Sequence, residues 1–519
     1  MLSVSNSYKK AIKADTELAW PDAEFGFVPP GATEGSSVTV SLQAEQLSYP
    51  VQVNNKVYNM SDFWATGEIN RIVLDGTRKM PDRPPNLDQE IGFLSRAFSG
   101  ANGVFNQIPS ITYTLDRPYD LIGTQVYFDE PCNEYAFKLT VTFKSGAATL
   151  LSGTYSNDGP VFTLDAPLNN VTSIVITITA WNLPYRMAKV PTVIPGQIRY
   201  LKDKLISAHL IERIAPFDSA MSFPQVKLTF DNQDRAFDIV NPTGLVAFLR
   251  QRMYIESVIS IATGDGKSES VSIGSFLLYS WPDNSEDETA TFICAPSMAF
   301  LNGYYENTGR GQQTIAQAAA LIFSDEEYYI PAKLSVVMVN QYIGDNVPLR
   351  DAMGQLAVAA GGYFKCERDG SYTLIEWTKG VQSASDTLTY DEIWERPGIR
   401  QSPKVSKVNV KYYVWNATQK QLVEHSHIRS LDPDDGELKE VTSMFISSSM
   451  SAEQVADKAL DYYGRRLSYD VKYRGDMSLE QGDTLSVETD YGNSAVLITE
   501  NIISFGNTHL DGSAKGVGI

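Results

Sequence analysis

The sequence predicts a mainly β protein with α+β parts, in which a β-sandwich is inserted and a small α/β segment follows. Short segments of alternating apolar and polar residues, rich in β-branched and aromatic types, recur over most of the chain. Helical periodicity is concentrated between about residues 300 and 395. A chain of 519 residues is too long for one hydrophobic core, so we expect roughly three or four domains.

The clearest strand pattern runs from Phe223 to Trp281. Val226, Leu228 and Phe230 alternate with polar residues and should share one buried face. The polar run 231–234 then breaks the strand, and a Gly264-Asp265-Gly266 turn separates two further alternating segments. This region is predicted to be a strand followed by a hairpin.

Residues 60–197 form a second β-rich region with a different spacing. Segments such as "FKLTVTF" and "SIVITITAWN" follow one another at intervals of 8–20 residues, which is typical of a β-sandwich or jelly roll. The strands at 36–54 should need partners that resume near Gln197, so we interpret 60–197 as an insertion.

Helix signals mark four places. A helix is expected in residues 1–19, and Thr314 with Gln317 forms a capping box before the next one. A helix from Pro348 should end at Gly361-Gly362, ahead of a hairpin with Asp369-Gly370 at its turn. Ser451 with Gln454 predicts another capped helix, which ends at about Leu467.

Composition excludes several classes of protein. The 43 Lys+Arg against 62 Asp+Glu give a net charge of −19, which argues against a general phosphate-binding surface. Cys132, Cys294 and Cys366 lie far apart and read as reduced, buried thiols. The first twenty residues lack an apolar core, so no secretory signal is expected, and no apolar run is long enough for a membrane span.

Candidate chemical motifs are weak. His425 and His427 share a strand face as metal ligands might, yet no third ligand follows at a recognisable spacing. Residues 266–268 imitate the end of a phosphate loop without its first glycine, and 432–437 imitate a calcium loop with its glycine misplaced. Residues 474–476 are Arg-Gly-Asp, the sequence of an adhesion tripeptide, and they lie at an expected turn. Paired carboxylates for glycoside hydrolysis are not excluded, but nothing singles out a pair. We therefore predict no enzyme, no cofactor and no metal site.

Two long segments resemble tail-tip hub proteins of tailed bacteriophages. They are "VKLTFDNQDRAFDIVNPTGLVAFLRQRMYIESVISI" with the following "SIGSFLLYSW", and "LRDAMGQLAVAAGGYFKCERDGSYTLIEW". The inserted region, from "FWATGEINRIVLDGTRKMPDRPP" to "LPYRMAKV", is similar to discoidin-like modules of some hub proteins. The resemblance implies a first hub β-barrel from 1–59 and 198–300, the insert at 60–197, an α/β hub domain at 301–395 and a second barrel at 396–519.

The resemblance also implies a function. A hub is a structural virion protein at the tail tip or baseplate, made in the host bacterial cytoplasm. There a homotrimer closes the tail tube and meets the distal tail protein, the tape-measure protein and, in some particles, tail fibres or a receptor-binding protein. The discoidin-like insert would add a carbohydrate-binding module for host attachment through a surface glycan.

Trp64, Arg71, Asp75, Arg96 and Asn102 fall in the early loops of the insert and are the candidate carbohydrate-binding residues. The competing interpretation is that Trp64 belongs to the core and the polar residues cap turns. For the whole chain, the alternatives are a tail-associated cell-wall or polysaccharide hydrolase, and a free bacterial lectin.

Overall fold

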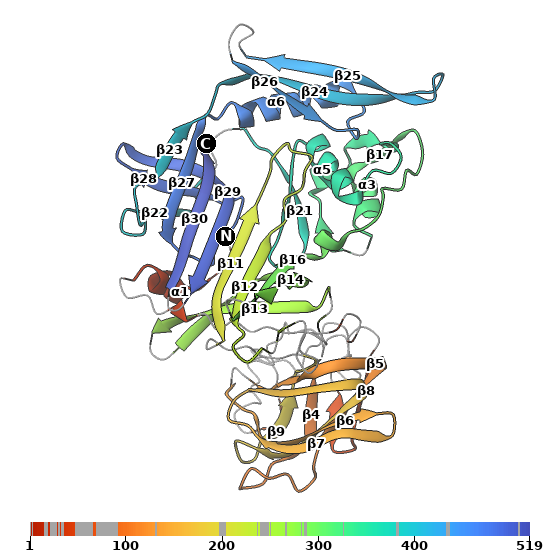
Figure 1. Ribbon diagram of the computed structural model, residues 1–519, viewed down its shortest axis with the longest axis vertical. Helices are drawn as coiled ribbons and strands as arrows, with labels where there is room; N and C mark the ends of the chain where they lie inside the picture. Colours follow the sequence, from red (N-terminus) through yellow and green to blue (C-terminus); the bar gives the residue numbers. More distant parts are fainter. Residues whose placement is uncertain are drawn as a thin grey trace. The chain divides into compact units, whose positions relative to one another are not determined.

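The computed structural model is mainly β with a few helices, which confirms the predicted fold class (Figure 1). It describes residues 2, 4–14, 19–20, 29, 32, 36–46, 66–68, 92–129, 132–196, 204–235, 237–238, 249, 251–264, 267–281, 283–284, 288–324, 326–379, 383–431, 436–506 and 509–519. The chain divides into two compact units. We call residues 1–23, 201–231 and 256–519 the large unit, and residues 24–200 and 232–255 the sandwich unit.

A 13-stranded sheet organises the large unit, in the order β1-β13-β14-β16-β12-β11-β29-β30-β27-β23, with β15, β22 and β28 beside this path. Its strands are β1 (Ala19–Trp20), β11 (Leu205–Arg213), β12 (Gln225–Asp231), β13 (Tyr254–Gly264), β14 (Lys267–Ser280), β15 (Asp283–Asn284), β16 (Thr289–Ala295), β22 (Asp386–Leu388), β23 (Gly398–Gln401), β27 (Leu467–Arg474), β28 (Thr484–Thr489), β29 (Gly492–Gly506) and β30 (His509–Gly518). The predicted β12 face is confirmed, because Val226, Leu228 and Phe230 are all buried.

One strand pair joins the two regions expected to form barrels. β11 lies antiparallel to β29, from Ser207 opposite Gly506 to Arg213 opposite Glu500. Among the described strands, the sheet path is open and ends at β1 and β23. The two regions are therefore observed as halves of one continuous sheet.

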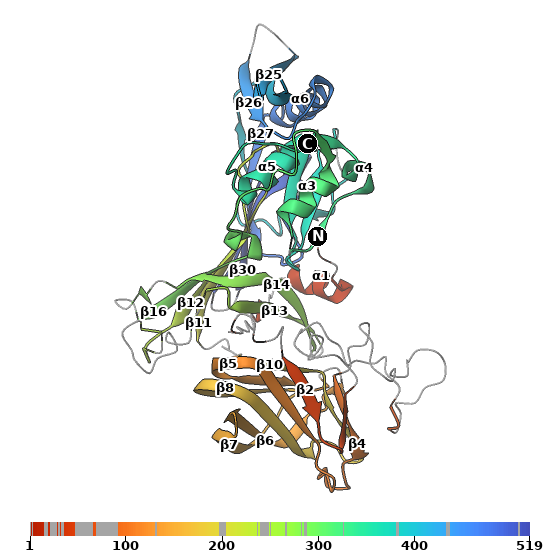
Figure 2. The ribbon, with the colours of Figure 1, turned by 90° about the vertical axis from the view of Figure 1, so that its right-hand side faces the viewer.

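A small α/β part lies beside this sheet (Figures 1 and 2). It contains η4 (Ser297–Phe300), β17 (Gln312–Thr314), α3 (Ile315–Ile322), β18 (Tyr328–Tyr329), α4 (Ala332–Ser335), β19 (Met338–Asn340), α5 (Leu349–Ala359), β20 (Gly362–Cys366) and β21 (Tyr372–Glu376). The capping box is confirmed, since the Thr314 hydroxyl accepts from Gln317 N and the Gln317 side chain accepts from Thr314 N. Gly370, with φ of +92°, supplies the left-handed residue of the predicted β20–β21 turn.

The last helix, α6 (Ser449–Tyr463), packs on a three-stranded sheet of β24 (Val405–Asn416), β25 (Gln421–Ser430) and β26 (Glu437–Thr442). The predicted cap at Ser451 is wrong by three residues. Ser448 is the N-cap, because its hydroxyl accepts from Ser451 N at 3.2 Å. The first helix is also shorter than expected: α1 spans Asn6–Ile12 and buries Tyr8 and Ile12.

The sandwich unit has two sheets over one core. A six-stranded sheet runs β10-β5-β8-β6-β7 with β2 paired to β5, and a three-stranded sheet runs β3-β4-β9. The strands are β2 (Ser37–Val40), β3 (Ala44–Gln46), β4 (Phe93–Phe98), β5 (Ser110–Tyr127), β6 (Ala136–Ser145), β7 (Ala148–Ser156), β8 (Val161–Trp181), β9 (Met187–Val190) and β10 (Thr192–Pro195). Phe93 and Val190 from the smaller sheet share a buried cluster with Tyr113, Val141 and Ile176 from the larger one.

The partners expected for the strands at 36–54 are wrong for the described part, 36–46, and residues 47–54 lie outside the described residues. Val38 pairs with Tyr113 in β5, and Glu45 pairs with Leu94 in β4, so both early strands belong to the sandwich unit. Alternation identifies a strand and its buried face, but it does not identify the neighbouring strand.

Candidate functional site

The predicted carbohydrate-binding residues are only partly within the described structure. Trp64, Arg71 and Asp75 lie outside the described residues. Arg96 lies on β4, where its exposed side chain approaches Glu45, with 4.0 Å between Nε and Oε2. Asn102 lies in the loop after β4, and its Oδ1 accepts from Val104 N at 3.2 Å. No contact described here joins Arg96 to Asn102, and their binding role stays a prediction.

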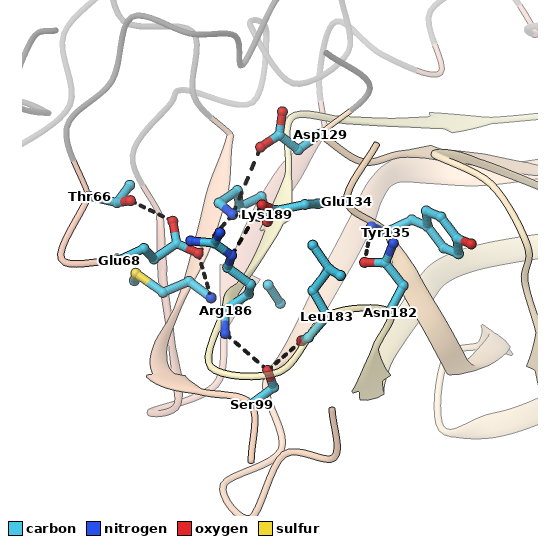
Figure 3. A network of polar contacts seen from close by, with 12 residues as sticks. Thr66, Glu68, Ser99, Asp129, Glu134, Tyr135, Asn182, Leu183, Arg186 and Lys189 are labelled. Atoms are coloured by element: carbon cyan, nitrogen blue, oxygen red, sulfur yellow. Dashed lines mark hydrogen bonds and ion pairs between the residues drawn. The ribbon is translucent and has the colours of Figure 1, made fainter. Parts of the chain in front are cut away.

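A buried ionic cluster lies in the same unit, around Lys189 of β9 (Figure 3). The Lys189 Nζ lies 2.8 Å from Glu68 Oε1, 2.5 Å from Glu134 Oε2 and 3.8 Å from Asp129 Oδ2. The three carboxylate side chains are at most 2% exposed. Charges removed from water to this extent must be paired. The ammonium therefore occupies the centre of a three-carboxylate cage.

Further contacts fix the cage to the backbone. Arg186 Nε lies 3.4 Å from Glu134 Oε1, whereas Lys189 contacts the other oxygen of that carboxylate, Oε2. Glu68 Oε1 also accepts from Met187 N at 2.9 Å, and Glu68 Oε2 accepts from Thr66 Oγ1 at 2.5 Å. The short segment 66–68 is thereby bound to β9.

This cluster is suited to holding the unit together, not to acid–base chemistry. A hydrolytic carboxylate pair must face a cleft that admits a sugar and, for inversion, a water molecule. Here the carboxylates are buried and the space between them is filled by Lys189. Sequence reasoning missed the cluster because its members come from three separate segments, around residue 68, at 129–134 and on β9. Its one local signal was a lysine within the apolar run "MAKVPTVI".

A second buried network supports the large unit. The Arg368 guanidinium pairs with Glu212 through Nε–Oε1 and Nη2–Oε2 contacts of 3.0 and 3.2 Å. It also donates to the carbonyls of Met477 and Leu479. Burial lowers the pKa of Arg368, but the Glu212 charge and hydrogen bonds outweigh burial and raise it overall. The β20–β21 hairpin is in this way connected to β11 and to the loop after β27.

The weak motifs of the sequence take structural roles. His425 stacks on Tyr412 with ring centroids 5.3 Å apart. Asp476 of the adhesion-like tripeptide is buried and accepts from the Tyr8 hydroxyl at 3.1 Å. Burial raises the pKa of Asp476. The calcium-like loop lies mostly outside the described residues, as does the turn between β13 and β14.

Within the described ranges, no group of three or more His, Cys, Asp or Glu side chains is arranged to hold a metal ion. Of the helices described, none has the length and apolar character needed to cross a membrane. Cys294 and Cys366 are buried as expected, whereas Cys132 is only partly buried.

Comparison with solved structures returns tail and baseplate proteins, the kind of protein that the sequence resemblance indicates. A tail protein from Neisseria meningitidis is 11% identical with a TM-score of 0.43, and the match covers 62% of this chain and 93% of that one. A 43 kDa tail protein of prophage MuSo2 from Shewanella oneidensis is 14% identical with a TM-score of 0.41, covering 62% and 95%. A chain in the virion of a gene transfer agent is 12% identical with a TM-score of 0.31, covering 82% and 80%. Similarities this low do not assign a function. No protein-family model matches the sequence, and no curated protein matches it significantly.

Proposed function

We propose that the chain is a structural hub protein of a phage tail tip or baseplate, or of a related particle, and that three copies close the tail tube as a ring. The observation that carries the proposal is the β11–β29 pairing, which makes one sheet of the two regions expected to form the hub barrels. The quoted hub-like segments support it, since they include β12, most of β13 and β14, and α5 to β21, and outside residues 232–255 they belong to the large unit.

Ring closure requires two different surfaces on each copy, because a ring forms from heterologous contacts. The described sheet offers two different ends, at β1 and at β23. All four residues of β23 are exposed. An exposed edge strand presents unpaired backbone groups that a neighbouring chain can pair with. In this proposal the ring contacts the distal tail protein, the tail tube and the tape-measure protein.

The domain division forms part of the proposal. The α/β hub domain takes 301–395, the second barrel region takes 396–519, and the insert lies within the first barrel region. In the proposal the insert also includes β2 and β3, since both pair inside the sandwich unit.

Solution mass tests the ring. The purified chain should sediment at three times its 57.4 kDa mass. Ile399→Lys on the exposed edge strand β23 should shift it toward monomer. Ile428→Lys on β25 is a matched control on a different exposed edge strand, and should leave the mass unchanged. A wild-type chain that stays monomeric at high concentration and is absent from particles would overturn the hub proposal.

The sandwich unit is proposed to bind a host-surface glycan, because loops at one end of a sandwich can combine an aromatic platform with polar groups. The competing function is a tail-associated hydrolase of cell wall or polysaccharide. Zymography on host cell walls separates the two: clearing of the wall by the purified chain would favour the hydrolase, and binding without clearing would favour the hub.

A further inference from the structure

Two loops of the sandwich unit are held side by side by hydrogen bonds through Ser99. We call residues 99–108 and 182–186 the tip loops. Ser99 N donates to Arg186 O at 2.8 Å, and Tyr185 N donates to Ser99 O at 3.1 Å. The Ser99 hydroxyl donates to Leu183 O at 2.9 Å and accepts from Arg186 N at 3.1 Å (Figure 3). The two loops therefore form one preorganised surface.

Apolar side chains are exposed on and beside these loops. Tyr185 is 57% exposed, and four further side chains are between 37% and 45% exposed: Phe98, Val104, Ile108 and Leu183. A single exposed apolar residue on a soluble protein needs no explanation, whereas several on and beside two hydrogen-bonded loops make those loops a candidate interaction site.

Tyr185 also has an unfavourable backbone. Its φ is +58°, in the left-handed region where a bulky side chain is strained and where glycine is free of strain. Such strain persists only where surrounding contacts impose it, and it concentrates at binding sites. The Ser99 hydrogen bonds supply that constraint. An exposed ring in a strained backbone contributes little to folding, so its role is best sought in binding.

The surroundings of Tyr185 indicate the chemistry of the ligand. The one charged residue of the tip loops is Arg186, whose guanidinium pairs with the buried Glu134; residues 99–108 and 182–185 contain none. Exposed carboxamides are present instead, at Asn102, Asn106 and Gln107. An anionic membrane surface would call for clustered Lys and Arg. A neutral sugar needs an aromatic face for its C–H groups and amides for its hydroxyls.

We propose that the tip loops bind a neutral pyranose, with the sugar ring stacked on Tyr185 and the carboxamide of Asn102 hydrogen-bonding its hydroxyls. The inference rests on the proposed glycan-binding role of the sandwich unit and assigns that role to a surface. Of the five residues predicted from the sequence, it retains Asn102 and adds Tyr185.

The test compares four full-length proteins on an array of neutral hexose and N-acetylhexosamine glycans. They are wild type, Tyr185→Gly, Tyr185→Phe and Tyr491→Ala, the last being a fully exposed tyrosine in the large unit. Tyr185→Gly should weaken binding about tenfold or more, since an aromatic contact of this kind is worth about 1.4 kcal/mol with its buried area. Tyr185→Phe and Tyr491→Ala should bind like wild type. Glycine fits the left-handed backbone, so Tyr185→Gly should keep its circular dichroism spectrum and unfold at the wild-type temperature or above.

The outcomes are distinguishable. If the wild type binds a neutral glycan and Tyr185→Gly binds it equally well, the tip assignment is overturned and the glycan site lies elsewhere on the unit. Absence of wild-type binding to every neutral glycan overturns both the tip assignment and the glycan-binding role, without affecting the trimeric hub. Vesicles of phosphatidylcholine and phosphatidylglycerol form a further arm, and Tyr185-dependent binding to them alone would replace the sugar with a lipid surface.

Discussion

Replacing Lys189 with Met tests whether the buried cluster holds the sandwich unit together. Methionine keeps much of the aliphatic volume and removes the ammonium that lies 2.8 Å from Glu68 and 2.5 Å from Glu134. Breaking a buried pair by removing one partner costs about 3–5 kcal/mol, because the remaining charge has no compensation. For a unit of this size, that loss corresponds to a fall in melting temperature of roughly 6–20 °C. Arg186 remains in the variant, with its Nε 3.4 Å from Glu134 Oε1.

Thermal unfolding measures the loss, and hydrogen exchange in peptides covering 185–195 assigns it to β9. Lys333→Met is the matched control, because Lys333 is 78% exposed in its pair with Glu376 and should contribute under about 1 kcal/mol. Adding Glu68→Gln to Lys189→Met should restore part of the stability, so the two effects should not add. A Lys189→Met protein within about 1 kcal/mol of wild type would refute the reasoning.

Two further predictions concern the large unit. Arg368→Met should destabilise it by about 3–5 kcal/mol in urea unfolding, since Glu212 would stay buried without its partner. Arg396→Met is the control: it removes an exposed pair with Asp490 and should change the free energy of unfolding by less than about 1 kcal/mol. Similar effects of the two substitutions would argue against a structural role for the buried pair. Burial raises the pKa of Glu500, but Lys515 and Arg213 outweigh burial and lower it overall. The stability from Glu500 should therefore be present at neutral pH and be lost as the pH falls through the lowered pKa. The difference in urea midpoint between wild type and Glu500→Gln should shrink from pH 7 toward pH 3, and a difference that does not depend on pH would contradict it.

The parts of the fold that the sequence could predict are those that short segments determine. The β12 face, the Thr314–Gln317 capping box and the Asp369-Gly370 turn each depend on a few consecutive residues, and all three are observed. The errors concern choices that are not local. Ser448 competes with Ser451 for the start of α6, and both have the chemistry of a cap. The partners of β2 lie about 75 residues further along the chain, and those of β3 about 50 residues further.

Less of the candidate site than of the fold could be predicted from the sequence. Loop residues could be named from the sequence, and Asn102 does lie in an exposed loop. Neither Tyr185 nor the Lys189 cage could be named. The strain at Tyr185 is a backbone property imposed by Ser99, which is 86 residues away in the sequence. The cage assembles Glu68, the Asp129–Glu134 turn and Lys189 from three separate segments, and no spacing rule relates them.

The two structural features of the sandwich unit have complementary physical roles. Lys189 and Tyr185 are four residues apart, on β9 and in the loop that leads into it. The cage binds the start of β9 to segment 66–68 through Met187 N and Glu68, while Ser99 binds the preceding loop to the end of β4. Conformational freedom of the 182–190 segment is thus removed on both sides of Arg186, before any ligand arrives. A site that is rigid beforehand loses less entropy on binding. Because three such units on one ring would act together, even a weak individual site could retain a particle on a dense glycan surface.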